Sequence, residues 1–443
     1  MRLLTIAACV AVCLGAARAD EAEANRLPVE ATRLVREAAG LPPGEGRRRP
    51  DLLRVSDQAA PLASCDAPCV WEHQYGDGDL RSLWVMTDVL PRFDGTIVVI
   101  GGEWAARERR TWLAAFGPAG DRLWEQSGDG VICDGALIDG GIAVLAGDDH
   151  NGPSRVQILG PDGQGTAEFP LSFAAHAIAD DGNGGFLVMG SSPAPAVSRH
   201  DASGRELWTW SEPGGVVPGA ESGAVTAATV LPGGDVRVLG FWDGAAPEEG
   251  ARVIWTGTLG SDGTMRDVQV IDRVAPVRYP VDCDPIVRLW QIDTAGDGTV
   301  VRYDWTARPE GYRRTTVVRF DAAGAELWRR VEPADADLRA DPAVFDEIGA
   351  VSGARDGGML VAGQRTGPDS DHAGFVSRWS EEGETVWTTE IRRPSAGGRA
   401  NDAYFTAVAE ADDGGVLATM TDGAALLQMR GFIFRLGPDG EAP

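Results

Sequence analysis

A short turn motif that ends in glycine recurs seven times and divides most of the chain into units of similar length. The motif has the form x-[D/G/S]-x-x-G, and its closing residues are Gly120, Gly163, Gly204, Gly263, Gly324, Gly383 and Gly440. Successive copies are about 41 to 61 residues apart, and a Gly-rich turn followed by an apolar run precedes each copy in phase. Repeats of this length indicate small structural units that stack on one another to bury their apolar faces.

Each unit reads as four short strands. The first precedes the Gly-rich turn (224–231 in unit four), the second follows it (359–362 in unit six), and the third leads into the closing glycine (374–379). Runs of β-branched and aromatic residues bounded by Gly, Asp and Pro are typical of strands. A type I turn with the closing glycine in the left-handed conformation fits the connection from the third strand to the fourth.

The two ends of the chain predict how the units close. Unit seven stops three residues after Gly440 and lacks a fourth strand, whereas an orphan strand at 70–75 precedes unit one and resembles the fourth strands. Four-stranded antiparallel units packed radially form a β-propeller. We therefore predict an all-β, seven-bladed β-propeller in which the N-terminal strand completes the last blade and leaves no ring edge open. An open solenoid, with both ends unpaired, is the weaker alternative.

Tryptophan recurs four residues after the closing glycine or at the matching place in the orphan strand. The set comprises Trp71, Trp124, Trp208, Trp328 and Trp387. Because a buried Trp removes on the order of 150–250 Å² from water, we expect these side chains to fill the wedge between neighbouring blades as core. Carbohydrate-binding platforms would then lie elsewhere. Unit two has Phe169 near this place, and unit four has no aromatic residue there.

These repeats resemble a known group of proteins. The pattern D-G-G-x-L-V-x-G and then R-x-D-x-x-G-x-x-x-W, seen at 356–363 and 319–328, is similar to the Trp-rich repeats of exported bacterial β-propellers, including those related to pyrroloquinoline quinone-type propellers. The resemblance covers roughly residues 70–443 and implies a propeller in a group that contains scaffolds, binding proteins and some enzymes. Quinone-binding members need a cofactor cage, for which the sequence gives no basis, so we predict no cofactor.

The first 64 residues lie outside the repeats. Residues 1–19 combine Arg2, an apolar stretch and small residues before Asp20, which predicts a signal peptide cut after Ala19 and a periplasmic or secreted protein. A lipid anchor at Cys9 is the weaker alternative. No other stretch approaches the ~20 apolar residues of a membrane helix, so we expect no membrane insertion. Residues 20–64 are predicted to form a helix and linker, with a partner-binding tail as the alternative, and residues 65–443 to form the propeller.

The charge excludes several functions. The formal net charge of −26 becomes −28 without residues 1–19, which contain two Arg and no acid. A surface this negative repels nucleic acid and anionic lipid. All 40 basic residues are Arg, which excludes Schiff-base lysine chemistry and a lysine-bearing phosphate loop. The Arg-, Ala- and Gly-rich usage is typical of a GC-rich genome.

Four cysteines follow the predicted cleavage site: Cys65, Cys69, Cys133 and Cys283. An even number in an exported chain favours disulfides over metal ligands. Cys65 and Cys69 form our preferred pair. Cys133 and Cys283 lie in units two and five, nearly opposite in a seven-membered ring, and a disulfide needs Cα atoms within ~7 Å. We keep that pairing open and favour free buried thiols at these two positions.

The repeat predicts which face of the ring binds ligands. Connections from strand two to three, and from one blade to the next, share one face and include the long segments 103–110, 241–251, 304–314, 331–345 and 364–373. Long loops on a rigid ring are the usual binding surface. The candidate ligand-binding aromatics expected in these loops are Trp104, Trp242, Trp305 and Tyr312. The alternative is that they hold the loops against the blades.

Acids and one histidine are predicted at the inner strands. Asp134, Asp284, Asp346 and Asp402 begin these strands and would form an oxygen-rich ring for a divalent cation if they point at the channel mouth. The interpretation we favour is that each acid caps a turn through its own backbone. His176 lies in an inner strand, where it could face the channel; the interpretation we favour is a core histidine. No H-E-x-x-H, G-x-S-x-G or D-x-D-x-D-G motif occurs.

These features together predict an exported binding or scaffold propeller. We expect it to engage a protein or carbohydrate partner through its long-loop face without catalysis. The alternative is a hydrolase or lyase that acts on polysaccharide or peptide at the channel mouth, where acids and loop aromatics would meet.

Overall fold

A computed structural model gives the fold of the repeat region. It describes residues 71–75, 83–105, 108–147, 155–191, 194–211, 222–244, 252–275, 290–306, 313–333, 345–366, 372–391, 402–425 and 428–441. The chain divides into two units, Met1–Asp51 and Leu52–Pro443. All the described residues lie in the second unit, so the predicted signal peptide and the predicted helix and linker at 20–64 lie outside them.

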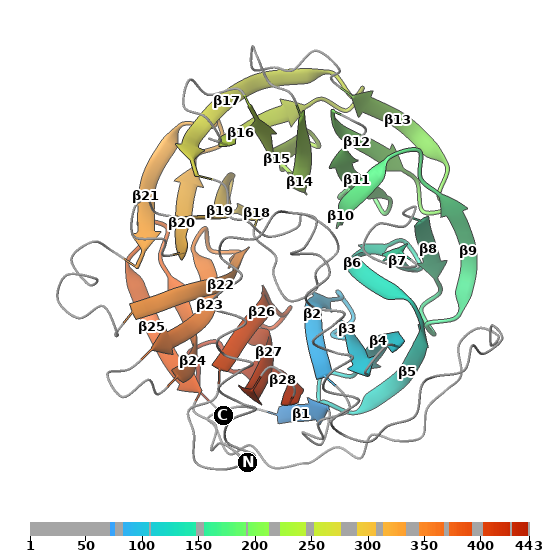
Figure 1. Ribbon diagram of the computed structural model, residues 1–443, viewed down its shortest axis with the longest axis vertical. Coiled ribbons are helices and arrows are strands. Elements are labelled where there is room, and N and C mark those ends of the chain that lie inside the picture. The colour runs from blue at the N-terminus through green and yellow to red at the C-terminus, as the bar shows by residue number, and fades with distance from the viewer. Residues whose placement is uncertain are drawn as a thin grey trace, which may run out of the picture. The chain divides into compact units, whose positions relative to one another are not determined.

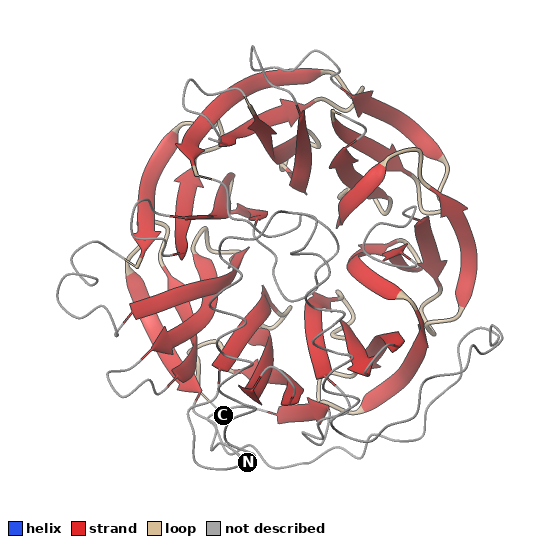
Figure 2. Ribbon diagram, viewed as in Figure 1, coloured by secondary structure: helices blue, strands red, loops and turns tan. Residues whose placement is uncertain are grey.

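The second unit is a seven-bladed β-propeller whose blades surround a central channel (Figure 1). Every blade has four antiparallel strands, and the described residues contain strands and turns but no helix (Figure 2). The predicted fold class is therefore confirmed. None of the described segments is a helix of the length and apolarity that crossing a membrane requires.

The strands occupy four positions from the channel outwards. The inner strands are β2 (Leu83–Pro91), β6 (Val131–Ile138), β10 (Ala174–Asp180), β14 (Ser222–Val230), β18 (Trp290–Ala295), β22 (Phe345–Gly353) and β26 (Asp402–Glu410). The second strands are β3 (Ile97–Ala105), β7 (Gly141–Gly147), β11 (Phe186–Ser191), β15 (Val236–Asp243), β19 (Gly298–Thr306), β23 (Met359–Thr366) and β27 (Val416–Ala425). The third strands are β4 (Glu108–Phe116), β8 (Arg155–Leu159), β12 (Pro195–His200), β16 (Arg252–Leu259), β20 (Arg313–Phe320), β24 (His372–Trp379) and β28 (Gln428–Leu436). The outer strands are β5 (Arg122–Asp129), β9 (Gly165–Pro170), β13 (Glu206–Ser211), β17 (Met265–Val274), β21 (Glu326–Glu332), β25 (Thr385–Ile391) and β1 (Trp71–Tyr75).

The ring closes through the N-terminal strand, as predicted. β1 pairs antiparallel with β28, with Trp71 opposite Arg435 and Tyr75 opposite Gly431, and so becomes the outer strand of blade 7 (Figure 1). A parallel contact between Leu83 and Met429 also links blade 1 to blade 7. Each inner strand contacts the inner strand of the next blade all the way round, including β2 with β26. This end-to-end pairing rules out the open solenoid.

The turn motif has the predicted geometry in every blade. All seven closing glycines have a positive φ, for example +85° at Gly120 and +82° at Gly383. In each turn the closing N–H donates to the carbonyl three residues earlier, as Gly383 does to Ser380 at 3.0 Å. Glycine adopts this left-handed backbone without the strain that a Cβ would cause. The repeat of glycine is thus a repeat of backbone conformation.

The apolar core is divided among the seams between blades. The buried apolar residues form seven clusters, each drawing on two neighbouring blades. Glycines of the second strands make room for aromatic rings of the third strands. A Cβ on Gly240 would lie 2.6 Å from the ring of Trp255, and one on Gly363 would lie 2.8 Å from that of Phe375. This explains why the apolar second strands end in glycine in several units.

The recurrent tryptophans join each blade to the next. The indole N–H groups of Trp124, Trp208, Trp328 and Trp387 donate to carbonyls in the third-to-fourth-strand turn of the following blade, at 2.7 to 3.2 Å. Their rings lie against the closing glycine of that turn, as Trp328 lies against Gly383. The rings are half-buried at the rim of the seam clusters. The predicted role between blades is confirmed, whereas the prediction that these four residues are core is wrong because each carries a polar group that reaches the turn.

Two seams use other side chains where the repeat departs from Trp. At the seam of blades 2 and 3, Phe169 packs on the ring of His200 with centroids 5.5 Å apart. At the seam of blades 4 and 5, the position four residues after Gly263 is Asp267, whose φ is +51°. Arg237, only 4% exposed, occupies this seam beneath the turn that closes at Gly324. Charge thus replaces an aromatic ring at this seam.

Candidate functional site

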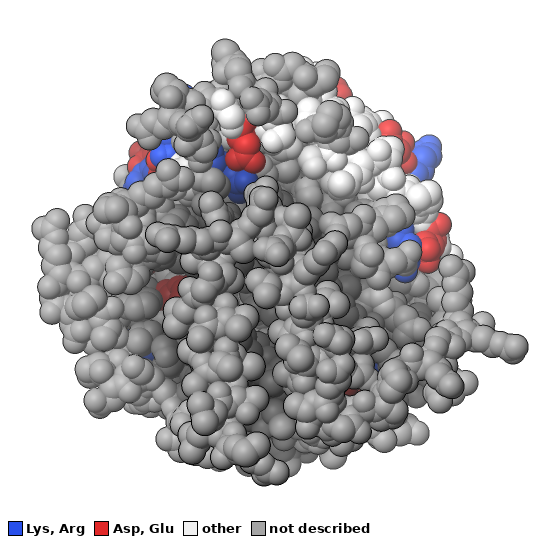
Figure 3. Space-filling model, in the orientation of Figure 1, with Lys and Arg blue, Asp and Glu red and all other residues white. Residues whose placement is uncertain are grey.

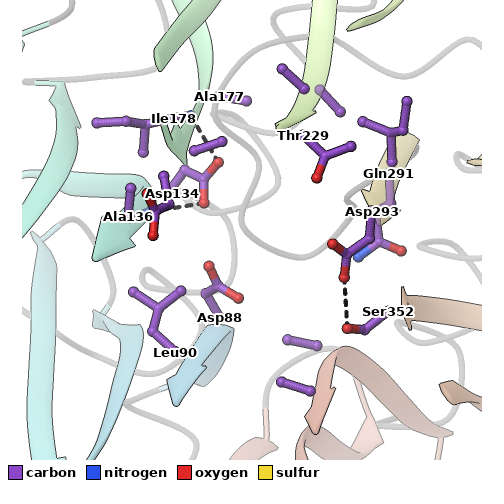
Figure 4. Close-up of a pocket in the computed structure, with 18 of the residues that line it drawn as sticks. Asp88, Leu90, Asp134, Ala136, Ala177, Ile178, Thr229, Gln291, Asp293 and Ser352 are labelled. Carbon is purple, nitrogen blue, oxygen red and sulfur yellow. Dashed lines mark hydrogen bonds between the residues drawn. The ribbon is translucent and has the colours of Figure 1, made fainter. Parts of the chain in front are cut away.

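The central channel contains a cavity of about 490 Å³. Residues of all seven inner strands line it. Figure 4 shows part of its wall, in which Asp88, Asp134 and Asp293 come from three different blades. Because an inner strand has no partner on its channel side, its unpaired N–H and C=O groups face this space. The side chains of the wall therefore have to supply hydrogen-bond partners for these main-chain groups as well as for any ligand.

Most inner strands carry a β-bulge at one equivalent position. The register against the second strand shifts at Thr87, Cys133, His176, Thr226, Gly349 and Thr406, whereas β18 pairs without a shift. A bulge adds one unpaired residue and bends the strand locally. These bulges re-aim side chains in the channel wall.

The residue at the bulge shows which blades keep the repeat and which depart from it. Thr87, Thr226 and Thr406 each donate a hydroxyl hydrogen bond to a carbonyl of their second strand, at 3.1 to 3.4 Å. Blades 2 and 3 place Cys133 and His176 there instead. The departures in these neighbouring blades bring a sulfur and an imidazole to the cavity wall.

Asp134, a predicted cation ligand, links two blades through main-chain hydrogen bonds. One carboxylate oxygen accepts from its neighbour Gly135 N at 2.8 Å. The other accepts from Ile178 N of blade 3 at 3.0 Å, as Figure 4 shows. The first bond is the capping through its own backbone that we favoured, and the second satisfies an edge N–H of the next inner strand.

Blades 5 and 6 repeat this link with other residues. The side-chain carbonyl of Gln291 accepts from Val351 N at 2.9 Å. Two residues further on, one oxygen of Asp293 accepts from Ser352 Oγ at 2.8 Å and from Gly353 N at 2.9 Å (Figure 4). Burial raises the pKa of Asp293, although these hydrogen bonds oppose the shift. Polar side chains of one inner strand thus satisfy the exposed edge of the next.

The sequence motifs gave no signal for this network. Gln291, Asp293 and Ser352 belong to no motif and stand far apart in sequence, and only the ring brings them together. An alignment of the seven units on their second strands would have placed Asp88, Asp134 and Gln291 at one register. That register is the signal that could have found them.

His176 lines the cavity. Its Nε2 lies 3.2 Å from the hydroxyl of Ser191, which ends β11. The sequence analysis did not find Ser191, because the two residues are 15 positions apart in separate strands and match no motif. The contact brings a base and a hydroxyl together at the channel wall.

The predicted ligand-binding aromatics lie in strands where the structure describes them. Trp242 is in β15, is 2% exposed and packs in the cluster between blades 3 and 4, so its predicted position in an exposed loop is wrong. Trp305 is in β19, half-buried, and donates to Thr316 Oγ1 at 2.9 Å. Trp104 is in β3, but its side chain, like the whole of Tyr312, lies outside the described residues.

The predicted cation ring is described only at Asp134. Asp346 and Asp402 lie at the starts of β22 and β26, but their side chains are outside the described residues, as is all of Asp284. Within the described part of the chain, no group of three His, Cys, Asp or Glu residues is arranged to hold a metal ion. A divalent cation at this ring therefore stays a prediction.

Cys133 is buried in the wall and is disulfide-bonded. The expected free thiol is wrong at this position. The other five cysteines of the chain all lie outside the described residues.

Comparisons with known proteins show the fold alone. No protein-family model and no curated protein matches the chain. Among solved structures, the chain is similar to the β-propeller domain of the Trilobed protease from Pyrococcus furiosus, at 8% identity over 80% of this chain and 95% of that one, with a TM-score of 0.49. It is also similar to the polysaccharide lyase Uly1, at 9% identity over 83% and 99% of the two chains, with a TM-score of 0.48.

A third similar structure is the Cps50 (Swd1) β-propeller domain of Myceliophteria thermophila, at 10% identity over 80% of this chain and 99% of that one, with a TM-score of 0.46. Identities and TM-scores this low leave function to be argued from the residues of this chain. The chain is a β-propeller repeat protein.

Proposed function

We propose that this propeller is an exported binding or scaffold protein that engages a protein partner through the face carrying its variable connections. The observation that carries the proposal is how connection length divides between the two faces. The six turns from third to fourth strand within blades 1 to 6 each contain five residues, for example 117–121 and 380–384. Connections on the opposite face range from one residue (130) to fifteen (275–289) between successive blades.

This division follows from the strand directions. An inner strand begins on the face where the preceding outer strand ends, so blade-to-blade connections and second-to-third-strand connections share that face. Constant turns are needed on the other face, because the seam tryptophans dock on their carbonyls. The widest range of lengths is therefore on the face of the blade-to-blade connections, and variable loops on a rigid scaffold are the usual site of recognition.

The channel wall supports binding over catalysis. Each oxygen of Asp134 accepts a main-chain N–H, and one oxygen of Asp293 accepts two hydrogen bonds from blade 6. Acids held in this way stabilise the ring. Along the rim, described acidic and basic side chains lie side by side (Figure 3), so the partner would meet a surface of mixed charge there.

Partner capture tests this proposal. Protein with the connections 244–251 and 367–371 shortened should lose partners that native protein retains from an envelope extract, and the loss should be reproduced with the purified partner. The matched control is Phe93→Ser, which changes a side chain 96% exposed on the constant-turn face and should capture normally. Undiminished capture by folded, loop-shortened protein would count against the proposal.

Export is part of the proposal and rests on residues 1–19 of the sequence. Sequencing the N-terminus of mature protein from the native host should start at Asp20 if the signal is cut after Ala19. An N-terminus at Met1 on protein recovered from the cytoplasm would exclude export.

One observation favours the alternative of an acyl hydrolase. His176 and Ser191 stand within hydrogen-bonding distance, at 3.2 Å, as a base and a nucleophile would. A serine-reactive fluorophosphonate should then label native protein and spare Ser191→Ala. Equal labelling of both proteins, or none of either, would remove this candidate.

A further inference from the structure

An exposed asparagine followed by glycine lies in the turn between β10 and β11. The chain has only four asparagines, at positions 25, 151, 183 and 401. Asn183 is exposed and precedes Gly184. Glycine has no Cβ to shield its amide nitrogen, so this nitrogen can approach the side chain of the residue before it. Whether it reacts there depends on whether a hydrogen bond holds its N–H.

Five blades join their inner and second strands by turns of one design. The first residue of the turn donates its N–H to the carbonyl of the fifth, as Ala354 does to Gly358 at 2.9 Å and Asp181 does to Gly185 at 3.2 Å. The fourth residue is a glycine with φ between +78° and +88°. These turns span residues 92–96, 181–185, 231–235, 354–358 and 411–415. They can therefore be compared residue by residue.

The N–H of this fourth glycine is bonded in four of the turns and unbonded in the turn of blade 3. The bonded glycines are Gly95, Gly234, Gly357 and Gly414, which donate to the carbonyl three residues earlier at 2.8 to 3.0 Å. Gly184 N donates to no group within the described residues. The equivalent carbonyl, that of Asp181, accepts instead from Arg199 Nη2 at 3.3 Å and from Asn183 Nδ2 at 3.4 Å.

We infer that Asn183 is a site of spontaneous deamidation in the folded protein. Gly184 N gives its proton to a base in the solvent and attacks the side-chain carbonyl carbon of Asn183. A new C–N bond forms, and the carboxamide nitrogen leaves as ammonia. Water then opens the resulting cyclic imide at either carbonyl, which leaves aspartate or isoaspartate in place of the asparagine. This modification goes beyond the proposed partner binding and does not depend on it.

The products would add a negative charge where blades 2 and 3 meet. Asp139 of blade 2 donates its N–H to the Gly184 carbonyl at 2.8 Å, and a Cβ on Gly184 would lie 2.3 Å from the Asp139 carboxyl carbon. Burial and the charges of Asp181 and Asp139 raise the pKa of Asp180. A further carboxylate therefore meets like charges at this seam, and isoaspartate also lengthens the main chain next to Gly184.

The turn of blade 3 has no spare cation for this new charge. In blade 6 the position of Asn183 is occupied by Asp356, which Arg378 of the third strand pairs with at 2.9 Å. The equivalent arginine of blade 3, Arg199, is buried and already pairs with Asp181 at 2.9 Å. Deamidation should therefore weaken the seam of blades 2 and 3.

Ageing of purified native protein at mildly alkaline pH tests the inference. Cleavage after arginine and mass spectrometry should show amide-to-acid conversion in the peptide 156–199, as separate aspartate and isoaspartate forms. Asn151, which also precedes glycine, lies outside the described residues and falls on another peptide, 123–155. Asn183→Gln should give no conversion in its peptide, because attack on the longer side chain would have to form a larger ring.

Asp94→Asn provides a matched control within one molecule. It creates the same dipeptide in the exposed turn of blade 1, where Gly95 N donates to the Arg92 carbonyl at 3.0 Å, and it keeps an oxygen for Thr96 N. The new asparagine should deamidate about three- to tenfold more slowly than Asn183, the usual effect of having to break one hydrogen bond. A synthetic peptide of residues 179–186 gives the rate without the fold.

Three results would overturn the inference. The first is no conversion at Asn183 in folded protein under conditions that convert the synthetic peptide. The second is equal conversion of both sites in Asp94→Asn, which would show that the glycine hydrogen bond does not matter. The third is a urea midpoint of Asn183→Asp no lower than that of Asn183→Gln, which would remove the predicted effect on the seam. Partner capture should persist in Asn183→Gln, so the two proposals fail independently.

Discussion

Removing one member of the buried Arg302–Asp304 ion pair should destabilise the ring severely. Both side chains are 0% exposed, and Arg302 Nη2 lies 2.9 Å from Asp304 Oδ2. The same nitrogen donates to the carbonyl of Ile348 in blade 6 at 2.8 Å, and Thr315 donates to Asp304 at 2.7 Å. The pair therefore connects the centre of blade 5 to the next blade, and Asp304→Leu would leave the guanidinium buried without its counter-ion.

The burial of the pair sets the size of the effect. Breaking a fully buried pair from one side costs about 3 to 5 kcal/mol, because an uncompensated charge stays in the interior. Replacing both members by apolar residues removes that charge, so Arg302→Met with Asp304→Leu should cost far less. The Ile348 carbonyl still loses a donor, for about 1 kcal/mol. We expect the double variant to lie about 1 to 2 kcal/mol below the native protein and above either single variant.

Urea unfolding followed by tryptophan fluorescence and by far-ultraviolet circular dichroism measures these differences. The dependence of the unfolding free energy on urea concentration should stay the same among variants, so that midpoints report stability. A double variant as unstable as the sum of the two single variants would refute the reasoning, because the two losses would then be independent. So would single variants that lose less than about 1 kcal/mol, since the pair would then be screened by water.

Three further predictions address the seams and the channel. Gly383→Ala should lower the unfolding free energy by about 1 kcal/mol more than Gly234→Ala. Both glycines have φ near +80°, but only at Gly383 would the new Cβ meet a ring, that of Trp328 at 3.0 Å. Equal losses of unfolding free energy, measured in urea, would contradict docking of the ring on the turn. Burial lowers the pKa of His73 and of His200 below 6.5, so the unfolded chain binds more protons than the folded one. The unfolding free energy should therefore fall as pH drops from about 7.5 to 5.5, by at most about 1.4 kcal/mol per pH unit for each histidine. A urea midpoint that rises as pH drops, or a pH dependence of the midpoint that His200→Gln leaves unchanged, would oppose this. Non-reducing peptide mapping should link the peptide of Cys133 to that of Cys283, which falls in the connection 275–289. A link from Cys133 to Cys65 or Cys69 would exclude this pairing.

The features that the sequence predicted are those that recur. Seven closing glycines marked seven turns, and all seven have the expected positive φ. The orphan strand was identified by its likeness to four other Trp-bearing strands, and its pairing with β28 closes the ring. A repeated pattern can be recognised because one physical requirement, such as a left-handed turn residue, acts at each copy.

Features found in one or two blades escaped prediction. The sequence showed that unit four lacks the recurrent aromatic residue, but not that Arg237 would lie in its seam beneath the turn of Gly324. Likewise, Trp242 was expected in the long connection 241–251, yet β15 continues through Asp243 and buries the ring. Tertiary packing decided both positions, and local sequence does not report which side chain arrives from a neighbouring blade.

The channel wall contains residues that recur in every blade and residues found in only one or two blades. Its position could therefore be predicted from the sequence, but its chemistry could not. Every blade contributes an inner strand, and six of the seven bulge at the same register. The default at this place is threonine, which bonds its own blade and maintains the fold. Cys133, His176 and Gly349 depart from that default, and Asp88, Asp134 and Gln291 depart from the alanine found one residue later in the other blades. A ring needs only the recurrent residues in order to close, so the departures collected around the cavity are where a ligand of this protein is to be sought.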